Sequence, residues 1–568
     1  MGCEASHTPP SEVSLYVSDT TGMTADMSIS QSDLTMNEQM DQSLDQEIDQ
    51  IPMDPHAVAS SEIPPQIFRL TQAQYKRIIQ TVFGASINLR FNLEPDLHVE
   101  GFASLGAGVG SISARGIEQY EEAAYFIAEQ AITEEFRSSF IRCPNDEIES
   151  EACLNTTLAQ LGLSLWRRPL KMDEMQTLLR IGQEVAQSSN FYTGLKYTIA
   201  FMLQSPYFLF RIEQGQTDTD STVRQLDAWE IASKISFLLW NSIPDQELFA
   251  AADSGELLQP EGYLNQIERM LADEQAKFGI RNFFYEYLRL DLLKNMRKDP
   301  NVFTHAQPEL AAVATEETLA LAEKVVLVDD RDMRTFFTSR QAYLNPLLAS
   351  IYDVPAPSSQ GFAWAELSAD DPRRGFFGQV SFLALYSHPV STSATLRGKF
   401  VRQKLLCGVI PPPPADVDTS VPEPSPDLPT LRDRIQVHLQ DPTCAGCHQL
   451  TDPIGLGFEQ FDGIGRFRLN ENGVRIDVTG ELDQDPFTTV GELSDLIITD
   501  SKWSPCLLKN VYHYVLGRSE LENAQAYLDA LTYWWPTQEY RLQALLIKLM
   551  THPRFTQLHV RDDMNVQE

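Results

Sequence analysis

The sequence predicts a mainly α protein with little β structure. Apolar residues recur at helical spacing through most of the chain after residue 68, most clearly in 69–84 and 224–240. The alternation typical of a strand appears in one short stretch, 473–482, where we expect a hairpin. We therefore expect a scaffold of many packed helices that carries a small, chemically distinct domain near the C-terminus.

Start and stop signals place the individual helices. Thr71 can cap a helix that begins beside it, and Gly84 can end that helix after a run with one apolar face. A glycine-rich segment, 101–110, lacks the lysine of a phosphate-binding loop and precedes an expected helix at 115–138. The same signals predict the remaining helices at 224–240, 246–253, 261–273, 276–293, 308–328, 331–339 and 430–440.

Two further segments are interpreted as structural. Trp166-Arg167-Arg168-Pro169 is typical of a helix end closed by proline, with an anion-binding site as the alternative. The stretch 411–429 opens with a run of prolines and is interpreted as a stiff spacer. A ligand for an SH3-type domain is the alternative for this second segment.

The charge of the chain excludes one class of partner. The sequence has 44 Lys and Arg against 79 Asp and Glu, a formal net charge of −35. Nucleic-acid binding requires a basic surface that neutralises phosphates, so we expect no nucleic-acid partner. The first Lys or Arg is Arg69, and we interpret residues 1–62 as a disordered acidic tether that is dispensable for folding.

Cys3 indicates a membrane anchor and a compartment. A small residue followed by cysteine and a flexible tether is typical of a bacterial lipoprotein, whose signal would then precede Met1. The alternative is N-myristoylation of Gly2, because Ser6 completes that short pattern. We favour the lipoprotein, which predicts an extracytoplasmic protein, in the periplasm or at the cell surface. The membrane would then be contacted only through a lipid on Cys3.

The stretch Cys444-Ala445-Gly446-Cys447-His448 is the one motif that indicates a specific chemistry. Two cysteines three residues apart, followed by histidine, form the attachment pattern of a covalent c-type haem. Each thiol adds across one vinyl group of the porphyrin, and the histidine ligates the iron. The small residues between the cysteines suit a turn against a flat cofactor. We therefore expect one covalent haem c, bound through Cys444, Cys447 and His448.

Two other interpretations of the motif stay open. The cysteines could form a structural disulfide or half of a zinc site, although no second C-x-x-C completes a four-cysteine set. With haem, the chain passes electrons to an unknown redox partner, alone or within an oxidoreductase on an unknown substrate. Without haem, it is a non-catalytic surface protein that binds or scaffolds. We favour the redox function and leave enzymatic activity open.

The remaining cysteines are even in number. If Cys3 carries lipid and two cysteines carry haem, four are left: Cys143, Cys153, Cys407 and Cys506. An even remainder in an exported protein predicts two disulfides. The short loop favours Cys143–Cys153, and Cys407–Cys506 would then tie the start of the proline-rich linker to the C-terminal part of the chain.

The second axial ligand decides whether the haem only carries electrons or also binds small molecules. Methionine is the usual ligand in electron carriers, but no Met lies between His448 and Met550. The histidine candidates are His388, His438, His513 and His552. His438 precedes the helix-breaking Pro442, and His513 is expected to pack within a helix. His388 lies on a loop that can fold over the ring, so we favour His388, with an open or water-bound position as the alternative.

The order of several motifs resembles a family of multi-domain proteins of unknown function, found in planctomycetes and myxobacteria, that carry a planctomycete-type cytochrome c region. The resemblance covers residues 68–556 and rests on Arg69-Leu70-Thr71 with Tyr75, Gly101 to Tyr120, Trp166 to Leu170, Ser205 to Leu209, Ile235 to Trp240 with Pro244-Asp245, Arg374-Gly375, Thr392-Ser393, Arg397-Gly398, Cys444 to Arg466 and Tyr514 to Arg518. It implies an exported cytochrome-like protein, places Arg466 among the cofactor-binding residues, and implies no substrate. The chain departs from the family at Ala394, where relatives often carry Pro. It also departs at Thr451, where they often carry Met, and this removes a thioether that could have ligated iron.

The motifs and the resemblance together divide the chain into six segments. These are the tether (1–62), an N-terminal helical module (63–140), a second helical module (141–204), a central helical domain (205–354), the module with the proline-rich linker and the haem site (373–470), and a C-terminal helical module (471–560).

Overall fold

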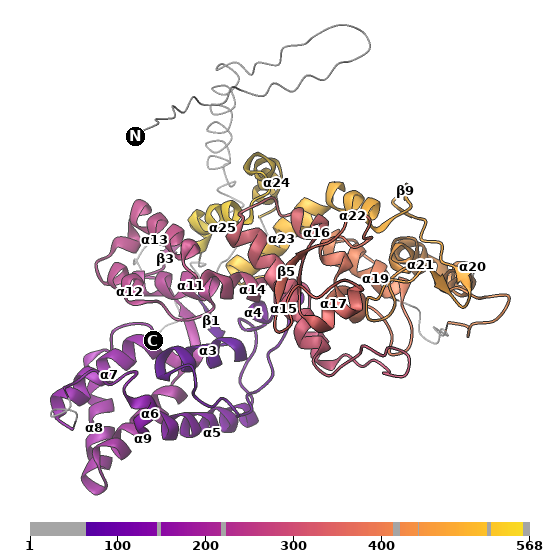
Figure 1. Cartoon of the computed structure of the whole chain (residues 1–568). Helices are drawn as coiled ribbons and strands as arrows, with labels where there is room; N and C mark the ends of the chain where they lie inside the picture. The colour runs from indigo at the N-terminus through magenta and orange to yellow at the C-terminus, as the bar shows by residue number, and fades with distance from the viewer. Residues whose placement is uncertain are drawn as a thin grey trace, which may run out of the picture. The chain divides into compact units, whose positions relative to one another are not determined.

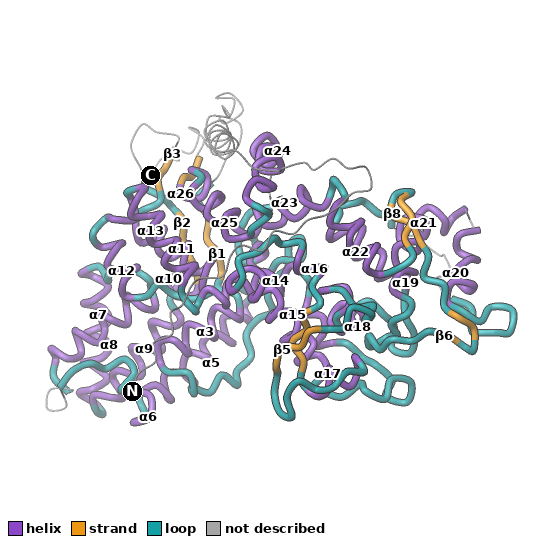
Figure 2. The backbone as a smooth tube through the Cα atoms, turned by 45° about the horizontal axis from the view of Figure 1, so that its top comes forward, coloured by secondary structure: helices purple, strands orange, loops and turns teal. Residues whose placement is uncertain are grey.

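A computed structural model describes residues 64–144, 149–216, 223–412, 421–440, 442–519 and 524–559. The tether 1–62 with Cys3, and part of the proline-rich linker, lie outside the described residues. Figure 2 shows a mainly helical chain with a few short strands, which confirms the predicted fold class. Within the described ranges, no helix is both long and apolar enough to cross a membrane.

The N-terminal helices share one apolar core. They are α3 (Gln72–Phe83), α5 (Ala114–Ala131), α6 (Glu134–Arg137), α7 (Glu151–Leu165), α8 (Met172–Ser188) and α9 (Phe191–Gln204). The short helix α4 (Ala103–Gly106) instead contacts α23 (Trp503–Leu516). Thr71 caps α3 in a reciprocal pair with Gln74, and Gly84 follows its last turn, as predicted. Figure 1 shows α5, α7, α8 and α9 gathered together, and their apolar faces meet around Leu158 and Ile199.

The helix expected at 115–138 is interrupted. α5 ends at Ala131, and α6 begins after Thr133, whose backbone is extended. The break turns the chain so that the buried Phe136 lies against Gly84, where an added Cβ would come within 3.3 Å of its ring. Tertiary packing has therefore overridden a continuous helical pattern.

The Trp166-Arg167-Arg168-Pro169 segment is structural, as its first interpretation held. α7 ends at Leu165, and the Arg167 guanidinium donates to the carbonyl oxygens of Leu165, Tyr207, Phe208 and Phe210. Burial lowers the pKa of Arg167 to about 9, which leaves it charged at neutral pH. Arg168 pairs with Glu174 at 2.7 Å. The donors of both arginines are thus engaged by protein oxygens.

The central part of the chain is also helical. Its helices are α10 (Pro206–Leu209), α11 (Ala228–Trp240), α12 (Gln246–Asp253), α13 (Pro260–Ala272), α14 (Ala276–Tyr287), α15 (Leu310–Glu323), α16 (Thr335–Thr338) and α17 (Pro346–Tyr352), with short turns η1 (Glu256–Leu258) and η2 (Leu290–Asn295). The helix expected at 308–328 is α15 followed by a π-helical turn, η3 (Lys324–Val328). The helix expected at 276–293 ends at Tyr287, because Arg289 adopts a left-handed φ of 57°.

Three strand pairs join segments that the sequence did not indicate as strands. β1 (Gln66–Arg69) pairs with β2 (Phe210–Glu213), β3 (Val223–Gln225) with β10 (Gln557–His559), and β4 (Gln341–Leu344) with β5 (Ala363–Glu366). All three pairs are antiparallel. The second pair fastens the end of the described chain to the start of the central helices.

The prediction of a single hairpin at 473–482 is wrong, because two short hairpins occupy this region. β6 (Asn470–Glu471) pairs with β7 (Val474–Arg475), and β8 (Gly480–Leu482) pairs with β9 (Asp485–Phe487). Positive φ angles occur at Asn472 and Gly473, and again at Asp483 and Gln484. Two-residue turns of this kind close a hairpin at once, so each pair of strands is complete within its own few residues.

The C-terminal part contains α18 (Val380–Leu385), α19 (Ala394–Phe400), α20 (Leu431–Gln440), α21 (Pro442–Gly455), α22 (Val490–Thr499), α23 (Trp503–Leu516), α24 (Gln525–Trp534), α25 (Leu542–Thr551) and α26 (Pro553–Thr556). The turns η4 (Gly375–Gly378), η5 (Val401–Leu405), η6 (Leu456–Phe458) and η7 (Trp535–Gln538) lie between them. α19 packs against α21, and α23 packs against α24 and α25.

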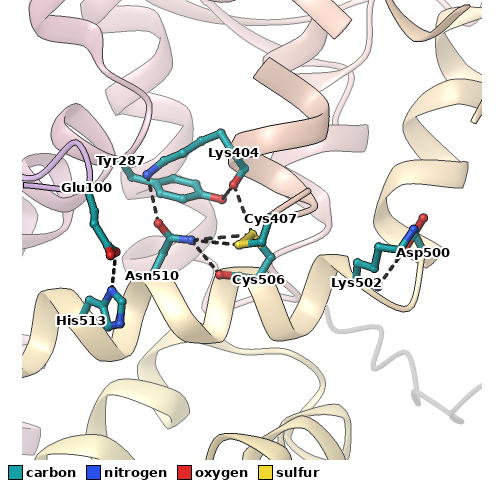
Figure 3. Close-up of a disulfide and its surroundings, with 9 residues drawn as sticks. All are labelled: Glu100, Tyr287, Lys404, Cys407, Asp500, Lys502, Cys506, Asn510 and His513. Atoms are coloured by element: carbon teal, nitrogen blue, oxygen red, sulfur yellow. Dashed lines mark hydrogen bonds and ion pairs between the residues drawn. A yellow bond between two sulfur atoms is a disulfide. The ribbon is translucent and has the colours of Figure 1, made fainter. Parts of the chain in front are cut away.

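Both predicted disulfides are present. Cys143 bonds to Cys153, and Cys407 bonds to Cys506. The second disulfide joins the end of η5 to α23, next to Asn510 (Figure 3). Lys404 donates to the Asn510 side-chain oxygen at 3.0 Å, and burial lowers the pKa of Lys404 to about 8. The disulfide therefore links the segment before the proline-rich linker to the C-terminal helices, as expected.

Candidate functional site

The cysteine motif lies on helix α21, directly after α20. Cys444, Cys447 and His448 are three and four residues apart, so their side chains lie on one face of the helix. The prediction of a turn at Ala445 and Gly446 is therefore wrong, because both residues lie within the helix. Pro442 explains the difference, because proline is favoured in the first turn of a helix, where its missing amide hydrogen has no helical partner.

The two motif cysteines are free thiols. Cys444 and Cys447 are each partly exposed, and the two described disulfides join other cysteines. Burial and the negative charge of Asp452 raise the pKa of the Cys447 thiol. This shift favours the neutral thiol of Cys447 over its thiolate. The structural-disulfide alternative finds no support in this arrangement.

A buried carboxylate holds the His448 ring in one orientation. The His448 Nδ1 atom lies 2.8 Å from Asp452 Oδ2, and Asp452 is fully buried. The other carboxylate oxygen accepts hydrogen bonds from Thr395 at 2.8 Å and Thr451 at 3.1 Å. A carboxylate on Nδ1 selects the tautomer with its hydrogen there, which leaves the lone pair of Nε2 for a metal.

Close packing of two helices places that carboxylate. An added Cβ on Gly398 of α19 would lie 1.8 Å from the Thr451 carbonyl oxygen of α21. An added Cβ on Gly455 would lie 1.8 Å from the Ala394 carbonyl oxygen. Only glycine permits this approach at both ends of the contact, and the approach brings Thr395 within hydrogen-bond reach of Asp452.

Two buried arginines hold the segment that follows the motif. Arg397 is fully buried and donates to the carbonyl oxygens of Leu383, Phe458, Phe461 and Asp462. Arg373 donates to the carbonyl oxygens of Gly378 and Gly465. Both arginines therefore position backbone. Arg466, which was expected at the cofactor, is exposed, and its main chain closes a turn with Asp462.

The four candidate axial histidines lie in different surroundings. The His438 ring on α20 has its centroid 4.7 Å from that of His448, so the break at Pro442 brings these two rings together. His513 is buried and bonds to Glu100 at 2.7 Å, which confirms the expectation of a packed histidine. His552 caps the short helix α26 with its ring nitrogen.

His388 lies on the loop between α18 and α19, as expected. Its carbonyl oxygen accepts a hydrogen bond from Lys298 at 3.0 Å, and its amide donates to Ser391. Partial burial and the charge of Lys298 lower the pKa of the His388 ring. The ring is therefore neutral at pH 7, which is the form that can ligate a metal.

These residues fit a covalent haem c. The helix face presents two free thiols and an imidazole whose Nδ1 is already engaged, which is the donor set that the attachment requires. In the part of the chain that the structure describes, no group of three or more His, Cys, Asp or Glu side chains is arranged to hold a metal ion directly. The zinc alternative is therefore without support from this geometry.

Asp452 and Thr395 are site residues that the sequence analysis missed. Asp452 could have been found, because it follows His448 by four residues and such pairs meet on one face of a helix. Thr395 gave no comparable signal, since it lies on another helix, 57 residues away along the chain from Asp452.

Four family models match separate stretches of the chain, and each describes a protein of unknown function. PSD3 (DUF1587) matches residues 69–133, PSD5 (DUF1595) matches 153–213, PSD4 (DUF1592) matches 226–354, and PSCyt3 (DUF1588) matches 373–471. The last stretch contains α19, α20, α21 and the cysteine motif. No curated protein and no solved structure matches the chain. The chain is therefore a multi-domain protein built from planctomycete-type domains of unknown function.

Proposed function

We propose that this protein is an exported, c-type cytochrome-like protein that transfers electrons through one covalent haem. The observation that carries the proposal is the face of α21, with two free thiols beside an imidazole oriented by the buried Asp452. The match of residues 373–471 to PSCyt3 supports a cytochrome-like domain in the same place. When bound, haem would supply a one-electron couple at its iron.

The residues of the chain would each have a distinct part. Cys444 and Cys447 would form the two thioether bonds, each by addition of its S–H across one vinyl double bond. His448 would ligate the iron through Nε2, while Asp452 holds Nδ1 and raises the basicity of the ring. The redox partner, and any substrate of a larger oxidoreductase, are left open by this proposal.

The cysteines also support the proposed compartment. Disulfides persist in oxidising compartments, and the described part of this chain has two. Covalent attachment of haem to cysteine belongs to the same setting outside the bacterial cytoplasm. We therefore propose an extracytoplasmic location, with a lipid anchor on Cys3.

Changing Cys444 and Cys447 together to alanine should abolish covalent haem. The protein would be produced by export in a host with a haem c maturation system. Haem staining of a denaturing gel and a pyridine haemochrome spectrum would measure attachment. The matched control is the Cys143→Ala, Cys153→Ala pair, which removes as many cysteines and should retain the stain. Wild-type protein without stain would contradict the proposal.

In the same experiment, Asp452→Asn should keep the covalent haem and change its potential. Both thiols remain, but the imidazole loses a charged acceptor and becomes a weaker donor to iron. We expect a higher reduction potential than in the wild type, measured by redox titration of the haem spectrum. An unchanged potential would show that Asp452 does not act through His448.

The second axial ligand is testable by adding carbon monoxide to the reduced protein. The sequence favours His388, whereas the His438 ring contacts the His448 ring and would have to move away for a macrocycle to lie between the two rings. If His388 is the ligand, the wild type should resist carbon monoxide and His388→Ala should bind it at once, seen as a Soret shift. His438→Ala is the matched control, because it keeps His388 and should therefore resist carbon monoxide as the wild type does. An immediate shift in the wild type would contradict both candidates.

A further inference from the structure

A second candidate site lies far along the chain from the cysteine motif, in a groove beside the π-helical turn η3. Two cavities of about 440 and about 460 Å³ share Lys277, Glu323 and Val328 in their linings, so they adjoin each other and are together called here the η3 groove. Its walls come from α14, α15 and the antiparallel pair β4–β5, and from α13 and α25. Figures 1 and 2 show α14, α15 and β5 close together. Cavities of this size hold small ligands in other proteins.

One end of the groove has an aromatic floor. Tyr343 and Trp364 are directly opposite each other in the β4–β5 pair, with ring centroids 4.9 Å apart. Phe362 also stacks on Tyr343, at 5.1 Å and an interplanar angle of 16°. Trp364 remains 39 % exposed despite these contacts. The Lys324 Nζ atom lies 5.6 Å from the centroid of the Trp364 ring, so part of this aromatic surface already contacts a cation and the exposed remainder is open to a ligand.

The walls of the groove are charged, and several of the charges are paired. Arg281 bonds to Glu323 at 3.0 Å and also to Glu316. Lys324 bonds to Asp329 at 3.1 Å. These pairs fix the positions of several hydrogen-bond donors and acceptors around the aromatic floor. Three further acidic side chains line the second cavity, so carboxylates outnumber cations in the groove and disfavour an anionic ligand.

The π-helical turn forms the middle of the groove. η3 directly continues α15 and presents Val328, which is 69 % exposed, at the place where the two cavities meet. π-helical turns are rare and occur frequently at functional sites. Their widened geometry alters which side chains face a surface, and here it supplies Lys324, Leu327 and Val328 to the groove.

We propose that the η3 groove binds a neutral oligosaccharide, with one sugar ring against Trp364. The C–H groups on the face of a sugar ring carry partial positive charge and are attracted to the negative face of an aromatic ring. The hydroxyl groups at the ring edge would exchange hydrogen bonds with Glu323, Arg281 and Lys277. Two joined cavities favour several linked sugars over one. A purely apolar ligand would bury these ion pairs without replacing the water they lose.

The proposal is tested with neutral hexasaccharides of glucose, xylose, mannose and N-acetylglucosamine as probes. Titration calorimetry and tryptophan fluorescence of the full chain should detect binding of at least one of them. Trp364→Ala should then weaken that binding by roughly tenfold or more, because it removes the stacking surface. Tyr533→Ala is the matched control, since Tyr533 is an aromatic residue, 76 % exposed, on a helix that does not line the groove.

A second variant separates binding from folding, because Trp364 also stabilises the β4–β5 pair. Val328→Arg places a long side chain at the junction of the two cavities, on a residue that the core does not need. This variant should weaken binding of the same hexasaccharide while leaving the circular dichroism spectrum and the melting temperature of the protein unchanged. Binding of none of the probes would overturn the proposal. So would binding that both Trp364→Ala and Val328→Arg leave intact.

Discussion

Replacing Cys407 and Cys506 together with alanine should give the largest loss of stability expected for this protein. The disulfide spans 99 residues of the sequence, including the cysteine motif and the proline-rich linker. A cross-link over a loop of that length restricts the unfolded chain, and its removal should cost about 4–5 kcal/mol. We expect the thermal unfolding midpoint to fall by roughly 4–5 °C, measured by scanning calorimetry or circular dichroism.

The other disulfide supplies the matched control. Cys143 and Cys153 are separated by 10 residues, so replacing that pair with alanine should cost less, about 3 kcal/mol or below. Both variants remove one disulfide and add no charge. An equal or larger loss for the Cys143–Cys153 pair would show that loop length does not decide the contribution of the longer cross-link.

Glu317→Gln should increase stability at alkaline pH. Glu317 on α15 is fully buried, and burial raises the pKa of its carboxyl to about 8, opposed by the hydrogen bond from Tyr352 and by the charge of Arg373. The Tyr352 hydroxyl donates to Glu317 Oε1 at 2.7 Å, and Arg373 lies over the Tyr352 ring. At neutral pH the carboxyl is therefore protonated, and glutamine imitates that form without being able to ionise.

The sign of the pH dependence follows from the raised pKa. Below the ordinary glutamate pKa, the carboxyl is protonated in both the folded and the unfolded chain, so it does not lower the free energy of unfolding. As the pH rises, the unfolded chain ionises first, so stability falls until the pH passes about 8 in the folded protein. The total loss should be about 5 kcal/mol as an order of magnitude.

Urea unfolding between acidic and alkaline pH would measure this effect. The Glu317→Gln variant should lose less stability than the wild type as the pH rises, and should be clearly more stable above pH 8. Glu118→Gln is the matched control, because Glu118 is largely exposed and should leave the pH profile unchanged. Parallel profiles for the wild type and Glu317→Gln would contradict the assignment of a neutral, buried carboxyl.

Many local features of the fold could be predicted from the sequence, because a few adjacent residues encode them. The cap at Thr71 and the stop at Gly84 bound α3, and α12 occupies the predicted range 246–253. Helical periodicity and capping act over one or two turns, so they can be recognised without a tertiary partner. The pairing of four cysteines was also accessible, because assigning the other three left few ways to pair them.

The candidate site was predictable only in part. Cys444, Cys447 and His448 stand together in the sequence, and their spacing alone indicates their chemistry. The contact of the His438 and His448 rings and the approach of Thr395 to Asp452 depend on how α19, α20 and α21 pack. Helix packing is set by the shapes of both surfaces, which a local pattern does not contain.

The sequence by itself determined the helical class, most helix positions and the residues that could hold a cofactor. Only the tertiary structure decided the short strands, the ring beside His448 and the η3 groove. β1 and β2 have four residues each and are stable only when paired. The paired residues are far apart in the sequence, since Gln66 pairs with Glu213 and most of two modules lies between them. A strand this short carries too little periodic signal to be recognised alone, and its partner is chosen by the packing of the helices between them.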